Sequence, residues 1–68
     1  SHNNRLLLAA ANASIRYAKE LTDDAISYWH KASKATDLLQ AQNYDSATLE
    51  ALQQELQILQ HRIKSRAA

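Results

Sequence analysis

The chain of 68 residues contains no glycine, proline, cysteine, methionine or phenylalanine. At ordinary usage a chain of this length would hold about five glycines and three prolines. Without them, the tight hairpin turns of β-sheets and the glycine-rich loops that bind phosphates are not expected. Without cysteine, neither disulfides nor thiolate metal sites can stabilise the fold. Side-chain packing must therefore hold together a domain near the lower size limit for a single core.

The residues that are present favour helices. Alanine, leucine, glutamine, lysine and glutamate dominate, and all have high helix propensity, so an all-α fold is predicted. The formal charge of +1 predicts no strong attraction to nucleic acid or to a membrane surface. The longest apolar run, "LLLAAA" at residues 6–11, is too short for a transmembrane segment. The lack of cysteine fits the cytosol, and a cytoplasmic location is expected.

Apolar and small side chains recur at alternating steps of three and four residues in two parts of the chain, as on a helix with one buried stripe. Between the two parts, Asn43 and Asp45 favour a turn, and Asp45 or Ser46 can cap the following helix. The first stripe consists of Leu8, Ala11, Ile15, Ala18, Thr22, Ala25, Trp29, Ala32, Thr36 and Leu39. The second consists of Leu49, Leu52, Leu56, Leu59 and Ile63.

The segment "LTDDA" at residues 21–25 has two interpretations. By periodicity alone, residues 4–41 form one helix about 57 Å long. The last helix could then cover only half of it, and the uncovered apolar half would require self-association or a permanent partner. By capping, Thr22 or Asp23 begins a separate second helix, with acidic side chains at its positive end. That arrangement buries all three stripes within one chain, although its turn lacks the usual glycine.

The preferred prediction is an antiparallel three-helix bundle, and the alternative is a long helical hairpin that self-associates. Ser1 and His2 are interpreted as the remnant of a cleaved tag, and residues 3–66 as one domain from a larger protein. The helices are expected at about 4–20, 23–41 and 46–65. The predicted core consists of Leu8, Ile15, Trp29, Leu39, Leu49, Leu52, Leu56, Leu59 and Ile63.

Two segments resemble a known family. "DDAISYWHKASKATDLL" at residues 23–39 resembles the second helix of MIT (microtubule-interacting and trafficking) domains, in which an acidic pair precedes alanine, an aliphatic residue, an aromatic residue and alanine. "LEALQQELQILQHRI" at residues 49–63 is similar to the third helix of that family. Leu21 and Thr22 stand where the family usually has glycine and tyrosine. The resemblance implies an adaptor that binds leucine-bearing helices from ESCRT-III tails, or an assembly module of autophagy lipid-kinase complexes.

A second face of the last predicted helix carries Ala51, Glu55, Ile58 and Arg62, about one position from the leucine stripe. One interpretation is that the buried stripe is simply wide. The other is a binding groove, with Ala51 and Ile58 as its floor and Glu55 and Arg62 as charged anchors for a docking helix. The MIT resemblance implies that this groove lies between the second and third helices and that Glu55 receives a basic residue of the partner.

No catalytic constellation is present, so neither an enzyme nor a cofactor is expected. His30 and His61 fall on different predicted helices without a carboxylate cluster, and are predicted to be surface residues rather than metal ligands. The predicted function is a non-catalytic interaction module that binds an amphipathic leucine-rich helix of a protein partner. The alternative is a structural α-hairpin, coiled-coil subunit or small co-chaperone that acts as a homodimer or in a permanent complex. No nucleic-acid partner is expected.

Overall fold

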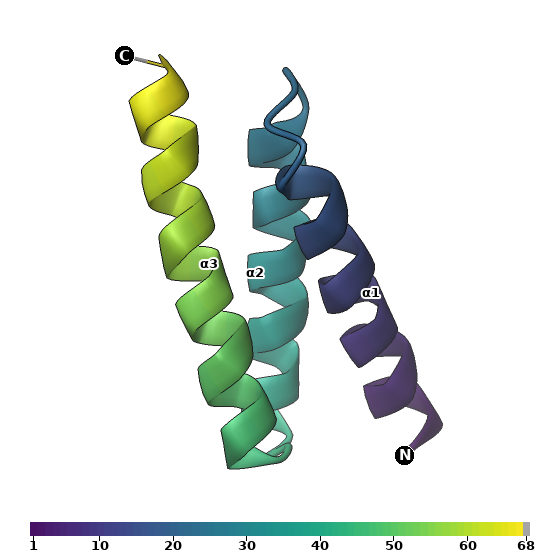
Figure 1. Cartoon of the computed structure of the whole chain (residues 1–68). Helices are drawn as coiled ribbons and strands as arrows, with labels where there is room; N and C mark the ends of the chain where they lie inside the picture. The colour runs from purple at the N-terminus through teal and green to yellow at the C-terminus, as the bar shows by residue number, and fades with distance from the viewer. Residues whose placement is uncertain (68) are drawn as a thin grey trace.

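The computed structural model describes residues 1–67 and consists of three helices in antiparallel succession (Figure 1). The helices are α1 (His2–Ala18), α2 (Ala25–Ala41) and α3 (Ser46–Ala67). The predicted all-α three-helix bundle is confirmed. The alternative of one helix over residues 4–41 is wrong, because the chain reverses between α1 and α2. Ser1 and His2, interpreted as a tag remnant, form the cap and the first residue of α1.

The first reversal is made without glycine. Leu21 takes a φ of 52°, in the left-handed region that glycine usually occupies at the end of a helix. Its backbone N–H donates to the Ala18 carbonyl at 3.1 Å, which closes the last turn of α1. The Thr22 hydroxyl accepts a hydrogen bond from the Asp24 backbone N–H at 3.4 Å, and α2 begins at Ala25, two residues later than expected. Leu21 therefore carries backbone strain of about 1–2 kcal/mol.

This strain gives a prediction for two substitutions of Leu21. Leu21→Gly and Leu21→Ala remove the same side-chain contacts, but only alanine keeps the Cβ that opposes a left-handed backbone. The glycine variant should therefore be the more stable of the two by about 1 kcal/mol in urea denaturation. At Ala10, an exposed position inside α1, the order should reverse, with Ala10→Gly less stable than the natural chain by about 1 kcal/mol. Equal stability of the two Leu21 variants would show that residue 21 carries no backbone strain.

The second reversal uses the expected turn residues. Asn43 takes a φ of 56°, which asparagine tolerates better than most side chains. Asp45 caps α3, because its Oδ2 accepts from the Thr48 hydroxyl at 2.7 Å and from the Thr48 backbone N–H at 2.9 Å. These two hydrogen bonds favour the charged carboxylate, and they lower the pKa of Asp45 below its ordinary value.

Small side chains dominate the buried faces of α1 and α2. The Thr36 hydroxyl among them donates to the Ala32 carbonyl at 2.8 Å, so this polar group is buried with a partner. Side chains of this size let two helices approach closely. Accordingly, α1 makes most of its contacts with α2 and few with α3. The small buried residues are Ala11, Ser14 and Ala18 of α1 and Ala25, Ala32, Ala35 and Thr36 of α2.

The larger core side chains come mainly from α3. Of the predicted core, Leu8 and Trp29 are half-buried and pack against the buried cluster. Ile63 is also half-buried but lies outside that cluster, near the α1–α2 turn, where little of the chain covers α3. The remaining predicted core residues are all buried: Ile15, Leu39, Leu49, Leu52, Leu56 and Leu59. Within residues 1–67, no helix is long and apolar enough to cross a membrane.

Candidate binding groove

A groove of about 370 Å³ lies between α1 and α3. The two helices pack on α2 from different sides, and their ribbons diverge toward the N-terminus of α1 (Figure 1). The alanine-rich contact holds α1 close to α2, so α1 leaves one side of α3 uncovered. The groove is lined by Leu8, Asn12, Ile15, Arg16, Lys19, Thr48, Ala51, Leu52 and Glu55.

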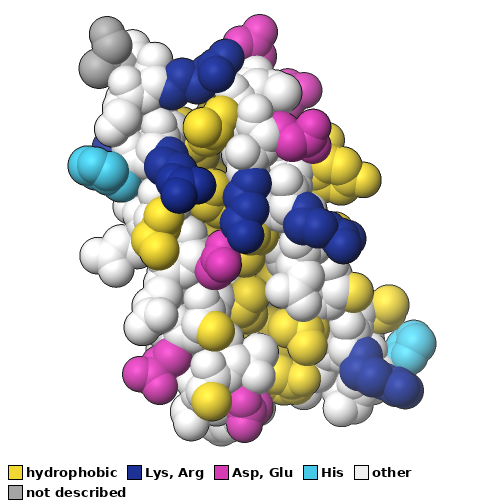
Figure 2. Space-filling model, in the orientation of Figure 1, with side chains coloured by type: hydrophobic (Ala, Val, Ile, Leu, Met, Phe, Trp, Pro, Cys, Tyr) yellow, Lys and Arg dark blue, Asp and Glu magenta, His cyan; other side chains and the backbone are white. Residues whose placement is uncertain are grey.

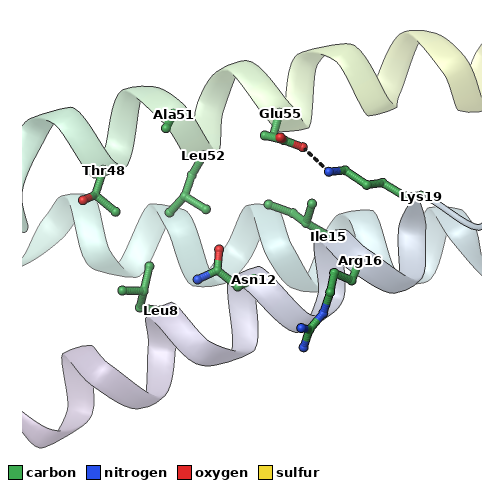
Figure 3. Close-up of a pocket in the computed structure, with 9 residues that line it drawn as sticks. All are labelled: Leu8, Asn12, Ile15, Arg16, Lys19, Thr48, Ala51, Leu52 and Glu55. Atoms are coloured by element: carbon green, nitrogen blue, oxygen red, sulfur yellow. Dashed lines mark ion pairs between the residues drawn. The ribbon is translucent and has the colours of Figure 1, made fainter.

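The groove has an apolar floor and a polar rim. Leu8 and Ile15 from α1 and Leu52 from α3 lie between the two helices (Figure 3). Ile15 and Leu52 are each 5 % exposed, so the floor is continuous with the core. In the space-filling view, an apolar strip follows the junction of α1 and α3, and Lys and Arg side chains gather across the middle of this face (Figure 2). An apolar floor with a polar rim is typical of surfaces that receive a helix.

One end of the groove is bridged by an ion pair. Lys19 Nζ, at the end of α1, lies 3.1 Å from Glu55 Oε2 on α3 (Figure 3). The two side chains are 47 % and 45 % exposed, so water screens the pair. It is the one ion pair found among residues 1–67, and Arg16 beside it makes none. The lining therefore holds two cations and one carboxylate, which gives this end a net charge of +1.

The α2–α3 side of the molecule is tightly closed beside Trp29. The Trp29 indole Nε1 donates to the Leu56 backbone carbonyl at 2.7 Å, and this bond ties α2 to the middle of α3. The depression that remains beside Trp29 has a volume of about 90 Å³ and also contacts Ile26 and Ile63. Beside Trp29, a partner helix therefore finds less room than between α1 and α3. A larger depression of about 350 Å³ lies farther along, where Leu21 and Ile26 face Ile63 at the end of α3.

The four residues of the predicted groove are divided between two places. Ala51 and Glu55 line the α1–α3 groove, rather than a groove between α2 and α3. Ile58 and Arg62 lie farther along α3, on an open surface outside that groove. Ile58 is 55 % exposed, so a wide core stripe does not explain it. Ile58 is exposed because the leucine stripe turns a different face of α3 toward the core.

Sequence reasoning missed the contribution of α1 to the rim. Asn12, Arg16 and Lys19 are spaced four and three residues apart, so they share one face of α1 beside its apolar stripe. That spacing was available in the sequence, but it does not reveal which other helix lies opposite. The pairing of Lys19 with Glu55 depends on how α1 and α3 sit on α2, which no pattern within a single helix specifies.

Other chemistry is sparse on this chain. His30 is exposed and lies edge-on to Trp29, with ring centroids 5.3 Å apart. Among residues 1–67, no three histidine, aspartate or glutamate side chains come together in a way that could hold a metal ion. No protein-family model matches the chain, and comparisons with curated proteins and with solved structures find no significant match. The α1–α3 groove is therefore the candidate functional site.

Proposed function

We propose that this chain is a non-catalytic protein-interaction module, and that its α1–α3 groove binds an amphipathic, leucine-bearing helix of another protein. The observation that carries the proposal is the separation of α1 from α3, which leaves Leu8, Ile15 and Leu52 as an apolar floor between two polar edges. A fourth helix placed there would cover the floor and complete the packing around α3. Recognition would then be of the helix-in-groove type.

The dimensions suit a short helix. From Leu8 to Lys19 the α1 wall extends about 16 Å, or roughly three helical turns. Leucines at positions i, i+4 and i+7 of a partner helix span about 10 Å, which fits within this length, and they project from one face. A groove of this length offers only a small contact area. We therefore expect a dissociation constant in the micromolar range.

The partner class follows from the MIT resemblance of residues 23–39 and 49–63. We propose the leucine-rich C-terminal helices of ESCRT-III proteins, bound by a cytoplasmic trafficking or autophagy factor that contains this module. The binding surface proposed here differs from the one that the resemblance implies, because it uses α1 and α3 instead of the second and third helices.

The test compares two alanine-to-glutamate variants by fluorescence anisotropy, with labelled C-terminal helices of ESCRT-III proteins as probes. Ala51→Glu places a charge on the groove wall and should weaken binding at least about tenfold. Ala10→Glu introduces the same side chain at an exposed position of α1 outside the groove, and should bind like the natural chain. Equal binding by both variants, or no binding of any helix by the natural chain, would contradict the proposal.

A further inference from the structure

We propose that the Lys19–Glu55 ion pair makes the α1–α3 groove selective for a partner helix with a carboxylate at one end. On binding, that carboxylate would take the place of Glu55 as the counter-ion of Lys19. The inference rests on the proposed function and adds the charge of the partner. It differs from the MIT resemblance, which implies that Glu55 receives a basic residue of the partner, because here Lys19 and Arg16 receive an acidic one.

The charges around the bridge favour an acidic partner. Glu55 is the one carboxylate in the lining, and it is already paired with Lys19 at 3.1 Å. Arg16 lies on the same face of α1 and makes no ion pair within residues 1–67. An incoming carboxylate would meet two cations, one of them unpaired. An incoming lysine or arginine would have to separate Glu55 from Lys19 and would then lie beside Arg16.

The exchange of one carboxylate for another requires little energy. Lys19 and Glu55 are both nearly half exposed, and exposed ion pairs of this kind contribute little to stability. After the exchange, the Glu55 carboxylate can turn to water, so no charge is left buried. The Lys19–Glu55 ion pair therefore discriminates between acidic and basic partner helices without blocking the groove.

The bridge also fixes where the carboxylate must be. In Figure 3, Arg16, Lys19 and Glu55 lie at one end of the groove, whereas Leu8 and Thr48 lie at the other. The leucines of the partner would cover the floor, and only a residue in its first or last turn would reach the cations. A carboxylate in the middle of its apolar face would instead meet Ile15 and Leu52.

The test uses designed amphipathic helices of about 20 residues, long enough to be helical, with leucines at i, i+4 and i+7. Versions differ at one position of the first or last turn, which carries glutamate, glutamine or lysine. The natural chain should bind one of the glutamate peptides about two- to fivefold more tightly than its glutamine counterpart. Glu55→Gln should increase that preference and Lys19→Gln should remove it. Lys34→Gln, at an exposed lysine of α2 outside the groove, should not change it.

Ionic strength provides a second readout. At about 1 M salt the Debye length falls to about 3 Å, so the preference for glutamate should shrink while leucine-dependent binding persists. Equal affinity for the glutamate and glutamine peptides, or tighter binding of a lysine peptide, would overturn the charge selectivity and leave the groove itself intact. Failure of every peptide to bind would overturn both the selectivity and the proposed function.

Discussion

Replacing Ile15 with aspartate should unfold the chain. Ile15 is 5 % exposed and belongs both to the core and to the groove floor. Burying an unpaired carboxylate there, with loss of the isoleucine packing, should destabilise the fold by about 4 kcal/mol or more. A single core in a domain of this size supplies only about 3–5 kcal/mol. Circular dichroism should therefore show a largely unfolded variant at 25 °C.

Ala10→Asp is the matched control, because Ala10 lies in the same helix but is exposed. It should keep its helical signal and nearly all of its stability. The result also separates the monomeric bundle from the structural-assembly alternative. If Ile15→Asp instead kept much of its helicity and only dissociated an oligomer in sedimentation, then α1 would serve an intermolecular interface and the account would be contradicted.

Trp29→Ala should cause the next largest loss of stability. The indole packs against the core from its half-buried position and donates a hydrogen bond to the Leu56 carbonyl. Truncation removes this packing and the hydrogen bond that joins α2 to α3. We expect a loss of about 3 kcal/mol in urea denaturation followed by circular dichroism. Trp29→Phe keeps most of the apolar ring and loses the hydrogen bond, so a loss of about 1 kcal/mol is expected from that term.

Tyr17→Ala is the control for an aromatic side chain at the surface. Tyr17 is half exposed and contacts Tyr28, with ring centroids 5.1 Å apart. Its truncation should change the stability by less than about 1.5 kcal/mol. If Trp29→Ala were no more destabilising than Tyr17→Ala, then the indole would not hold α2 and α3 together, and the α2–α3 side could open to a partner.

The stripes of the helices were predictable because burial follows the helical period directly. Alternating steps of three and four residues identify Ala11, Ala32 and Leu39 as inward-facing, and all three are fully buried. The same spacing continues across residues 21–24, so periodicity alone could not show that the helix ends there. Leu21 adopts the left-handed backbone conformation that glycine usually adopts at such a turn, and its side chain gives no indication of this in the sequence.

The groove was less predictable, because it depends on which pair of helices packs closely. The stripe of α1 is rich in alanine, but only the folded chain shows that this stripe packs against alanines of α2 rather than leucines of α3. Once α1 is held there, Glu55 faces Lys19 and Ile58 remains outside. The spacing in the sequence puts Ala51 and Glu55 on one face of a helix, but it does not show which helix lies opposite.

The most direct test of the groove is an amide NMR titration of the isotope-labelled chain with C-terminal helices of ESCRT-III proteins. We expect saturable shift changes on Ile15, Lys19, Ala51 and Glu55, with little change near Ile26. Shifts that gather instead beside Ile26, Trp29 and Ile63 would place the binding surface between α2 and α3. Dimer-sized lines that ignore every helix would mean that the groove is already filled by another copy. Either result would contradict the proposed groove.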